Sequence, residues 1–400
     1  AQSAVEVMCP SYKATLDRRH SPKGRAGLIR EWLRQGGPEG RADPDFETEV
    51  KAAMDGCLSC RACARACPVQ VDVPSFRAKF LHSWHARHRR PLRDHALSRL
   101  EGLLPLMEHL RPLTNVVVKG PGTALPRLLG LVNLPAFPKL RFRAEAQRQG
   151  LRTVAPGKRL DPARDVVIVP DAFTRHFEPG LLLDLAAVMR AMGFVPWLAR
   201  YRPSGKPRHV LGQLSAFARQ ARRQTANLST ITAQGVALVG IEPAVTLAYA
   251  SDYPEVEGLS ALPVSLPQEW LTAHLDRLPM LTDNEGAAVL LSHCTESTER
   301  PAGAAQWAEV LRCLGVTLDT PSTGCCGMAG TWGHLRENQA ISETIFAGSW
   351  APALTRAEIA GVPVLATGFS CRCQAKLRAG AHLRHPVSLL RALIGPGVAD

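Results

Sequence analysis

The sequence lacks long apolar runs, a signal-like start and a high cysteine content. No apolar stretch approaches the roughly 20 residues of a transmembrane helix, so we expect no transmembrane segment. The sequence does not begin with the positively charged and apolar regions of a secretory signal peptide, so we do not expect secretion. Eleven cysteines, an odd number gathered in short stretches, do not form a secreted disulfide scaffold. We therefore expect a reducing, cytoplasmic setting, with peripheral attachment to the inner membrane left open.

Acidic residues are in the minority, and the formal net charge is +13. A basic surface can release counterions from phosphates, which makes nucleic acid a partner to consider. Aromatic residues make up only 6% of the chain and no nucleic-acid-binding motif is recognisable, so we do not expect nucleic acid as a partner. The densest basic stretch, residues 77–99, is predicted to be a solvated face or a dock for another protein.

A run of four cysteines ending in proline is the most specific motif. Its spacing, C-x2-C-x2-C-x3-C-P, is formed by Cys57, Cys60, Cys63 and Cys67. This spacing is typical of bacterial ferredoxins, in which thiolates hold a [4Fe-4S] cluster and the fourth cysteine ligates a different cluster. A zinc knuckle or a redox dithiol is the alternative for a single C-x2-C pair, but three short intervals in succession favour the cluster.

If Cys67 serves a different cluster, the other three cysteines of the run need a fourth ligand from elsewhere. Cys9 is followed by proline, as the last cysteine of such a run would be, and is predicted to be that ligand. Residues 1–8 contain no cysteine, so the ligands that would complete the cluster of Cys67 are expected outside this chain. Between the two motifs, residues 24–34 are predicted to form an amphipathic helix with its arginines on the side away from the apolar residues.

An internal repeat occupies the rest of the chain. Residues 166–172 align without a gap with residues 288–294, a shift of 122 positions, and residues 235–239 match residues 361–365. Each copy has the pattern of a buried strand, a loop and an amphipathic helix. The alternation of strands and helices predicts two similar α/β domains built on parallel strands.

Cysteines occur in the second copy where the first copy has none. Loops at the carboxyl ends of parallel strands meet at one sheet edge, so we expect these loops to bring several thiols together. Thiols that converge from separate loops indicate a metal site: an iron-sulfur cluster is the first interpretation, and zinc and a redox dithiol are alternatives. His293 is either a ligand or an ordinary loop histidine, and Cys313 is predicted to be a small buried hydrophobe. The expected metal-binding residues are Cys294, Cys325, Cys326, Cys371 and, close behind them, Cys373.

These patterns predict an α+β multidomain protein. With 400 residues, 46% of them hydrophobic, the chain can bury a large core and should form two or three domains. A helical ferredoxin-like module is expected over residues 1–99 and a helical connector over residues 100–162. Two repeated α/β domains should follow, one without cysteines over residues 163–258 and one with metal-binding cysteines over residues 259–400.

The motifs resemble those of known iron-sulfur proteins. The stretch Cys325-Cys326-Gly327-Met328-Ala329-Gly330, with Cys294 before it and Cys371 after it, is similar to the CCG domain of heterodisulfide reductases and of the iron-sulfur subunits of glycolate and anaerobic glycerol-3-phosphate dehydrogenases. Together with Met8-Cys9-Pro10-Ser11-Tyr12 and the ferredoxin run, it resembles the C-terminal half of long bacterial FAD-linked oxidases of the D-2-hydroxyglutarate dehydrogenase type. One departure is that Cys371-Arg372-Cys373 replaces the usual C-x2-C.

The resemblance implies an oxidoreductase. A flavin domain or subunit outside this chain would oxidise a D-2-hydroxy acid, and the iron-sulfur part would pass electrons to an acceptor, either a quinone or a carrier protein. The chain would then hold [4Fe-4S] clusters but neither FAD nor substrate. Two alternatives are an iron-sulfur subunit of a glycolate or glycerol-3-phosphate dehydrogenase and a zinc-stabilised, non-enzymatic interaction module.

Overall fold

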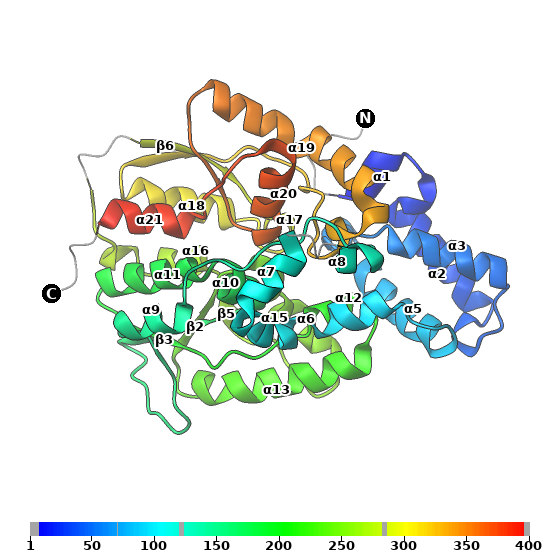
Figure 1. The fold of residues 1–400 in the computed structure, drawn as a ribbon, viewed down its shortest axis with the longest axis horizontal. Helices are drawn as coiled ribbons and strands as arrows, with labels where there is room; N and C mark the ends of the chain where they lie inside the picture. The colour runs from blue at the N-terminus through cyan, green and yellow to red at the C-terminus, as the bar shows by residue number, and fades with distance from the viewer. Residues whose placement is uncertain (1–7, 70, 120–123, 282–285, 396–400) are drawn as a thin grey trace.

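A computed structural model describes residues 8–69, 71–119, 124–281 and 286–395. Helices from the first quarter of the chain lie at one side of the molecule, and two parallel sheets with their helices make up the rest (Figure 1). The N-terminal helices are α1 (Pro10–Thr15), α2 (Pro22–Arg34), α3 (Pro44–Asp55), α4 (Ala62–Ala66) and α5 (Val73–Arg87).

Three of these helices begin at a polar cap next to proline. Ser21, Asp43 and Asp72 accept hydrogen bonds from backbone N–H groups in the first turns of α2, α3 and α5, at 2.9 to 3.1 Å. Each helix has a proline in its first two positions, where its missing N–H costs nothing. Trp32 and Phe80 pack edge to face in the centre of this module.

A connector of helices links this module to the sheets. It consists of α6 (Leu92–His109), α7 (Arg111–Lys119), α8 (Ala124–Leu128) and α9 (Phe142–Arg148). Helix α6 runs across the boundary expected between residues 99 and 100, and it continues through Pro105. Because Pro105 has no N–H, the carbonyl oxygen of Glu101 is free to accept the Tyr201 hydroxyl at 2.7 Å. No helix in the described ranges is long and apolar enough to cross a membrane.

The first sheet has five parallel strands in the order β1-β3-β2-β4-β5. Its strands are β1 (Arg152–Thr153), β2 (Asp165–Val169), β3 (Val195–Leu198), β4 (Ala237–Gly240) and β5 (Val264–Ser265). Its helices are α10 (Ala172–Phe177), α11 (Pro179–Ala191), α12 (Lys206–Val210), α13 (Leu214–Thr232), α14 (Pro243–Thr246), α15 (Ala248–Ser251) and α16 (Pro267–Thr272).

The second sheet has three parallel strands in the order β7-β6-β8, so its first strand is central, as β2 is between β3 and β4. Its elements are β6 (Gly286–Leu291), α17 (Cys294–Glu299), α18 (Gly303–Arg312), β7 (Val316–Asp319), α19 (Gln339–Ile359), β8 (Val364–Ala366), α20 (Phe369–Ala379) and α21 (Pro386–Ile394). The two sheets share one apolar core, which includes Leu182 of α11, Trp307 of α18 and Leu390 of α21, all fully buried.

Four arginines of the basic stretch make contacts within the fold, whereas Lys79, Arg89 and Arg99 are exposed. Arg77 is buried and donates to the Met54 carbonyl at 2.8 Å, and Arg90 donates to the Leu211 carbonyl at 2.5 Å. Arg87 and Arg93 form ion pairs with Glu47 and Glu337. The prediction of a solvated face or protein dock over residues 77–99 is therefore wrong for these arginines, because their charges join parts of the fold that are distant in sequence.

Arg61 connects the cysteine run to loops of both sheets. Its guanidinium lies 2.7 Å from Asp72, 2.7 Å from Asp252 and 3.1 Å from Glu299. Asp252 is fully buried and also pairs with Lys206 at 2.5 Å. Burial alone would raise the pKa of Asp252, but the neighbouring cations, led by Lys206, outweigh it and lower the pKa to about 2. The N-terminal module is therefore held on the sheets by a buried ionic network.

Replacing Arg61 with methionine should cost about 3–5 kcal/mol of unfolding free energy, because it leaves two buried carboxylates short of a partner. Urea denaturation followed by circular dichroism measures this loss. Arg65→Met is a matched control, because Arg65 is an exposed neighbour on α4 whose side chain donates a long, 3.4 Å bond to the Glu299 carbonyl. Equal stability of the two variants would contradict a structural role for the network.

Candidate metal centre

Cys9 and three cysteines of the ferredoxin run surround one small cavity. The cavity, about 20 Å³, is lined by Cys9, Cys57, Cys60 and Cys63 among others. Cys57 and Cys60 lie between α3 and α4, Cys63 is in the first turn of α4, and Cys9 directly precedes α1. No histidine or carboxylate is among the described residues that line it. A set of four soft thiolates fits a [4Fe-4S] cluster, and a zinc ion as well.

The backbone around this cavity takes conformations that are rare for L-amino acids. Cys9, Ser59 and Arg61 have φ values of 49°, 55° and 60°. Left-handed residues of this kind typically cost about 1–3 kcal/mol and persist where the surroundings hold them. None of the three is a glycine, so no residue type in the sequence indicated these turns. They reverse the chain sharply enough for closely spaced cysteines to face one point.

Arg25 is a buried cation beside Cys9. It is only 2% exposed, and its Nη1 lies 3.4 Å from the Cys9 Sγ. It also donates to the Ala53 carbonyl at 2.8 Å and to the Ser11 hydroxyl at 3.0 Å. Burial raises the pKa of the Cys9 thiol, and the charge of Arg25 opposes this rise. The predicted placement of the arginines away from the apolar side of α2 is wrong for Arg25.

Cys67 lies apart from the other cysteines of its run. It ends α4, is partly buried and does not line the small cavity. Its separation follows from the three-residue interval after Cys63, which carries the chain past the turn of α4. Cys67 therefore stays outside the set of four thiols that line the small cavity.

Four cysteines of the second sheet form a continuous chain of thiols. Cys294 contacts Cys325, Cys325 contacts Cys326, and Cys326 contacts Cys371. Cys294 begins α17 after β6, Cys371 is in α20 after β8, and the adjacent pair follows β7, so all four come from the carboxyl ends of strands. The pKa of Cys371 is about 11: contact with Cys326 lowers it, but burial and nearby thiols raise it. Metal binding at this site must therefore displace protons.

Two glycines are needed for this chain of thiols. A Cβ on Gly327, which has φ of 87°, would lie 2.5 Å from the Ser342 carbonyl oxygen of α19. A Cβ on Gly368 would lie 2.3 Å from the His293 ring and 3.1 Å from the Cys371 Sγ. The first glycine lets the Cys325-Cys326 loop approach α19, and the second lets the His293 ring pack beside the thiols.

Two further side chains border the second site. His293 is buried, and its Nδ1 accepts the Thr295 N–H at 3.2 Å as the cap of α17. Burial lowers the pKa of His293 to about 4, so the ring is neutral at pH 7. Glu242, from the loop after β4, accepts the Phe369 N–H at 2.8 Å, and burial raises its pKa to about 8. Sequence patterns could not identify Glu242, because its proximity depends on how the two sheets pack.

The remaining two cysteines of the second sheet lie outside this chain of thiols. Cys373 lines two cavities next to Phe177 and Phe369, on the connector side of α20. Cys313 ends α18 and packs, partly buried, against the shared core, as predicted for a small hydrophobe.

The two cysteine sites adjoin each other. Cys60 and Cys294 belong to one apolar cluster with Leu58, Trp332 and Ile345. Burial, followed by the proximity of Cys294, raises the pKa of Cys60 well above its ordinary value. A cavity of about 140 Å³ is lined by cysteines of both sites. Thiols that are more than 200 residues apart in sequence thus face a common interior.

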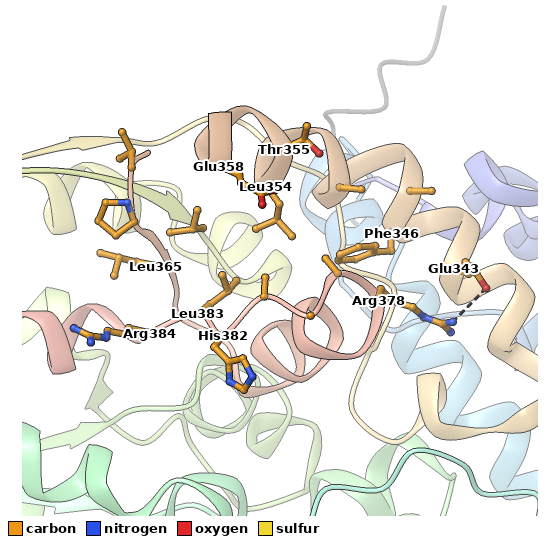
Figure 2. Close-up of a pocket in the computed structure, with 18 of the residues that line it drawn as sticks. Glu343, Phe346, Leu354, Thr355, Glu358, Leu365, Arg378, His382, Leu383 and Arg384 are labelled. Carbon is orange, nitrogen blue, oxygen red and sulfur yellow. Dashed lines mark hydrogen bonds and ion pairs between the residues drawn. The ribbon is translucent and has the colours of Figure 1, made fainter. Parts of the chain in front are cut away.

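A cavity larger than those at the cysteine sites lies elsewhere. It has a volume of about 850 Å³ and is lined by residues of α19, β8 and the chain after α20, including Phe346, Leu365 and His382 (Figure 2). An ion pair between Arg378 and Glu343, at 3.2 Å, borders it. No cysteine is among the described residues that line it, so size alone does not identify the chemical site of this molecule.

Comparison with known proteins agrees with the iron-sulfur interpretation. Residues 4–71 match the family model of the 4Fe-4S dicluster domain, and this range contains Cys9 and the whole ferredoxin run. The D-2-hydroxyglutarate dehydrogenase of Pseudomonas putida is 42% identical over 422 residues, which cover 96% of this chain and 41% of that protein. The Escherichia coli protein of the same name is 36% identical, over 98% of this chain and 42% of its own length.

A more distant relative is one of the subunits of the anaerobic glycerol-3-phosphate dehydrogenase of Escherichia coli. It is 26% identical over 317 residues, which span 76% of this chain and 77% of the relative. The chain spans about two fifths of the length of the D-2-hydroxyglutarate dehydrogenases that it matches. Its first part is therefore similar to the 4Fe-4S dicluster domain, and nearly its whole length is similar to part of the D-2-hydroxyglutarate dehydrogenases, as its motifs indicated.

Proposed function

We propose that this chain is the iron-sulfur electron-transfer part of an FAD-dependent D-2-hydroxy-acid dehydrogenase, with D-2-hydroxyglutarate as the substrate. FAD and the substrate would bind to a domain or subunit outside this chain. The observation that carries the proposal is the contact of the two cysteine sites through Cys60 and Cys294. The names of the relatives and the share of their length that this chain covers support it.

Each group of thiols has a role in this proposal. Cys9, Cys57, Cys60 and Cys63 would hold one [4Fe-4S] cluster, and Cys67 would be a ligand of another. Cys294, Cys325, Cys326 and Cys371 would hold a cluster or a zinc ion at the second site. Bound clusters would carry single electrons between a flavin and an acceptor. The protein supplies buried thiolates, the positive charge of Arg25, and apolar neighbours such as Leu58 that exclude water.

We also infer that the two sheets are repeats of one CCG-type unit and that only the second unit kept its cysteines. Strand order β3-β2-β4 in the first sheet corresponds to β7-β6-β8 in the second, which supports the repeat found in the sequence. The expected bounds of the first unit, residues 163–258, are too narrow, because β1 before them and β5 after them both pair in the first sheet. The second unit, expected over residues 259–400, therefore begins after β5, and the two units share a core.

A second candidate function keeps electron transfer and changes the partner. The similarity to the glycerol-3-phosphate dehydrogenase relative extends over most of its length, which favours an iron-sulfur protein that is one subunit of a dehydrogenase. Purification of the chain with its native partner, followed by assays with D-2-hydroxyglutarate and glycerol 3-phosphate, would separate the two candidates. A zinc-stabilised interaction module is the alternative from another class, and metal analysis tests it.

Metal analysis after anaerobic purification should find iron and acid-labile sulfide, with about eight irons per chain if both sites hold cubane clusters. Cys57→Ser and Cys325→Ser should each lower the iron content at one site, because serine replaces a thiolate ligand. Cys313→Ser is the matched control and should keep the iron, since Cys313 lies outside both sites. Zinc without sulfide in the unaltered protein would refute the electron-transfer function.

Arg25→Met should lower the reduction potential of the first cluster. Removing a buried positive charge favours the oxidised cluster, because that form is less negative than the reduced one. The reduction potential should fall by on the order of 60 mV, which corresponds to a tenfold change in a one-electron equilibrium. A redox titration followed by EPR measures the potential. Arg30→Met, on the same helix but exposed, should leave it unchanged. An unaltered potential in Arg25→Met at full iron content would exclude this role.

Gly368→Ala should empty the second site without removing a ligand, because its methyl group collides with the His293 ring and crowds the Cys371 Sγ. Metal at the first site should remain. Gly348→Ala is a suitable control: it lies within α19 with open space around it, and alanine favours a helix by about 1 kcal/mol over glycine. Full metal content at the second site of Gly368→Ala would show that this packing is not required.

A further inference from the structure

The connector helices enclose an apolar cavity next to the second cysteine site. The cavity has a volume of about 250 Å³. Its walls come from α6, α7 and the segment after α8, and include Leu100, Leu104, Val117, Leu131 and Phe137. Polar side chains contribute almost nothing to this lining, so a ligand that fills it must itself be apolar.

One wall of this cavity is built by segments that also form the cysteine site. Met328 and Gly330 follow the Cys325-Cys326 pair closely in the chain, and Cys373 lies on α20, the helix that also carries Cys371. Met328 also packs in one apolar cluster with Cys326 and Cys371. A molecule in the cavity would therefore lie beside the second thiol site.

The outer surface of the same helices is apolar. Leu106, Leu110, Leu113 and Val116 of the segment formed by α6 and α7 are 46 to 64% exposed. We call these four residues the leucine patch. Leu103, one turn before Leu106 on α6, is 42% exposed and also lines the cavity, so the cavity borders this exposed surface. Exposed apolar patches of this kind mark interaction sites.

Positive charges accompany the leucine patch. Residues 102–141 contain five lysines and arginines but a single acidic residue, Glu108. The charge of Glu108 is engaged by His176 at 2.8 Å and by Arg175 at 3.3 Å. Lys119, Arg127, Lys139 and Arg141 are exposed. Apolar side chains with lysines and arginines around them are typical of helices that lie in the surface of an anionic membrane.

We propose that the leucine patch binds the surface of an anionic membrane and that the adjoining cavity takes up a membrane-dissolved quinone. This inference rests on the proposed electron-transfer function, for which the quinone would be the acceptor. Its reduction to the quinol takes two electrons, which are those removed from the hydroxy acid, and two protons from water. The proximity of the cavity to Met328 and Cys373 places the quinone beside the second thiol site.

A membrane explains this surface better than a protein partner does. Protein interfaces draw their binding energy mainly from tryptophan, tyrosine and arginine, whereas leucine and valine contribute less than their number suggests. The patch consists of leucine and valine, and Arg111 beside it is engaged by the carbonyl groups of Pro138 and Lys139. A bilayer needs no directional contacts, only apolar area and positive charge.

Vesicle sedimentation tests the membrane contact. The protein should sediment with vesicles of phosphatidylethanolamine and phosphatidylglycerol at low salt, and less with phosphatidylcholine vesicles. The double variant Leu106→Glu, Leu113→Glu should bind about tenfold more weakly, because two charges enter the apolar surface. Leu33→Glu, at a leucine of α2 that is 54% exposed, should bind like the unaltered protein. No binding by the unaltered protein, or equal binding by the double variant, would overturn the proposal.

Equilibrium dialysis with decylubiquinone, a short-chain quinone, tests the cavity. Val117→Trp should fill the cavity and weaken quinone binding about tenfold, while circular dichroism and vesicle binding stay unchanged. Unaltered quinone binding in this variant would overturn the assignment of the cavity. Iron and sulfide are measured on the same samples. A protein with full iron and sulfide content that binds neither quinone nor vesicles would refute this inference alone. A protein without iron and sulfide would refute the proposed function.

Discussion

The contact between the two cysteine sites depends on charge compensation by one arginine. Arg61 stands between Cys60 and Cys63 in the sequence, and its guanidinium enters a pocket of buried carboxylates contributed by the segment before α5 and by both sheets. Buried charges are tolerated only when they are paired, so these carboxylates hold the cysteine run in one place. The residue that helps to turn the run around its cavity is thus also the one that docks it against Cys294 and its neighbours.

Both cysteine sites owe their shape to the backbone as much as to the thiols. At the first site, non-glycine residues in left-handed conformations bend the chain around a point. At the second, Gly327 and Gly368 allow α19 and His293 to approach where a Cβ would not fit. The surrounding packing must hold these conformations, since none is favourable by itself. Such rigidity is what a site needs in order to present several buried thiols to one ligand.

The excess of positive charge serves two different purposes in this fold. Arg25, Arg61 and Arg77 are directed inward, where they meet carbonyl groups, carboxylates and a thiol. Lys119, Arg127, Lys139 and Arg141 of the connector are exposed, in the same stretch of chain as the leucine patch. A net charge read from composition cannot separate these uses, because it records how many charges are present and not which of them are already paired. In this chain four arginines of the densest basic stretch are bonded within the fold, while four cations of the sparser connector stay exposed.

Much of the chemistry could be predicted from the sequence alone. The cysteine spacing, the proline after Cys9 and the repeat that aligns Cys294 with Ala172 are local patterns, and they determined the two groups of thiols and the parallel strands. Only the tertiary structure decided that the two sites share an interior, that Cys373 lines a separate cavity, and that Arg25 and Glu242 border the thiols. The physical reason is that the spacing of residues along the chain governs which of them share a turn or a sheet edge. Contact between segments that are distant in sequence depends instead on which buried charges and apolar surfaces pair when the whole chain packs.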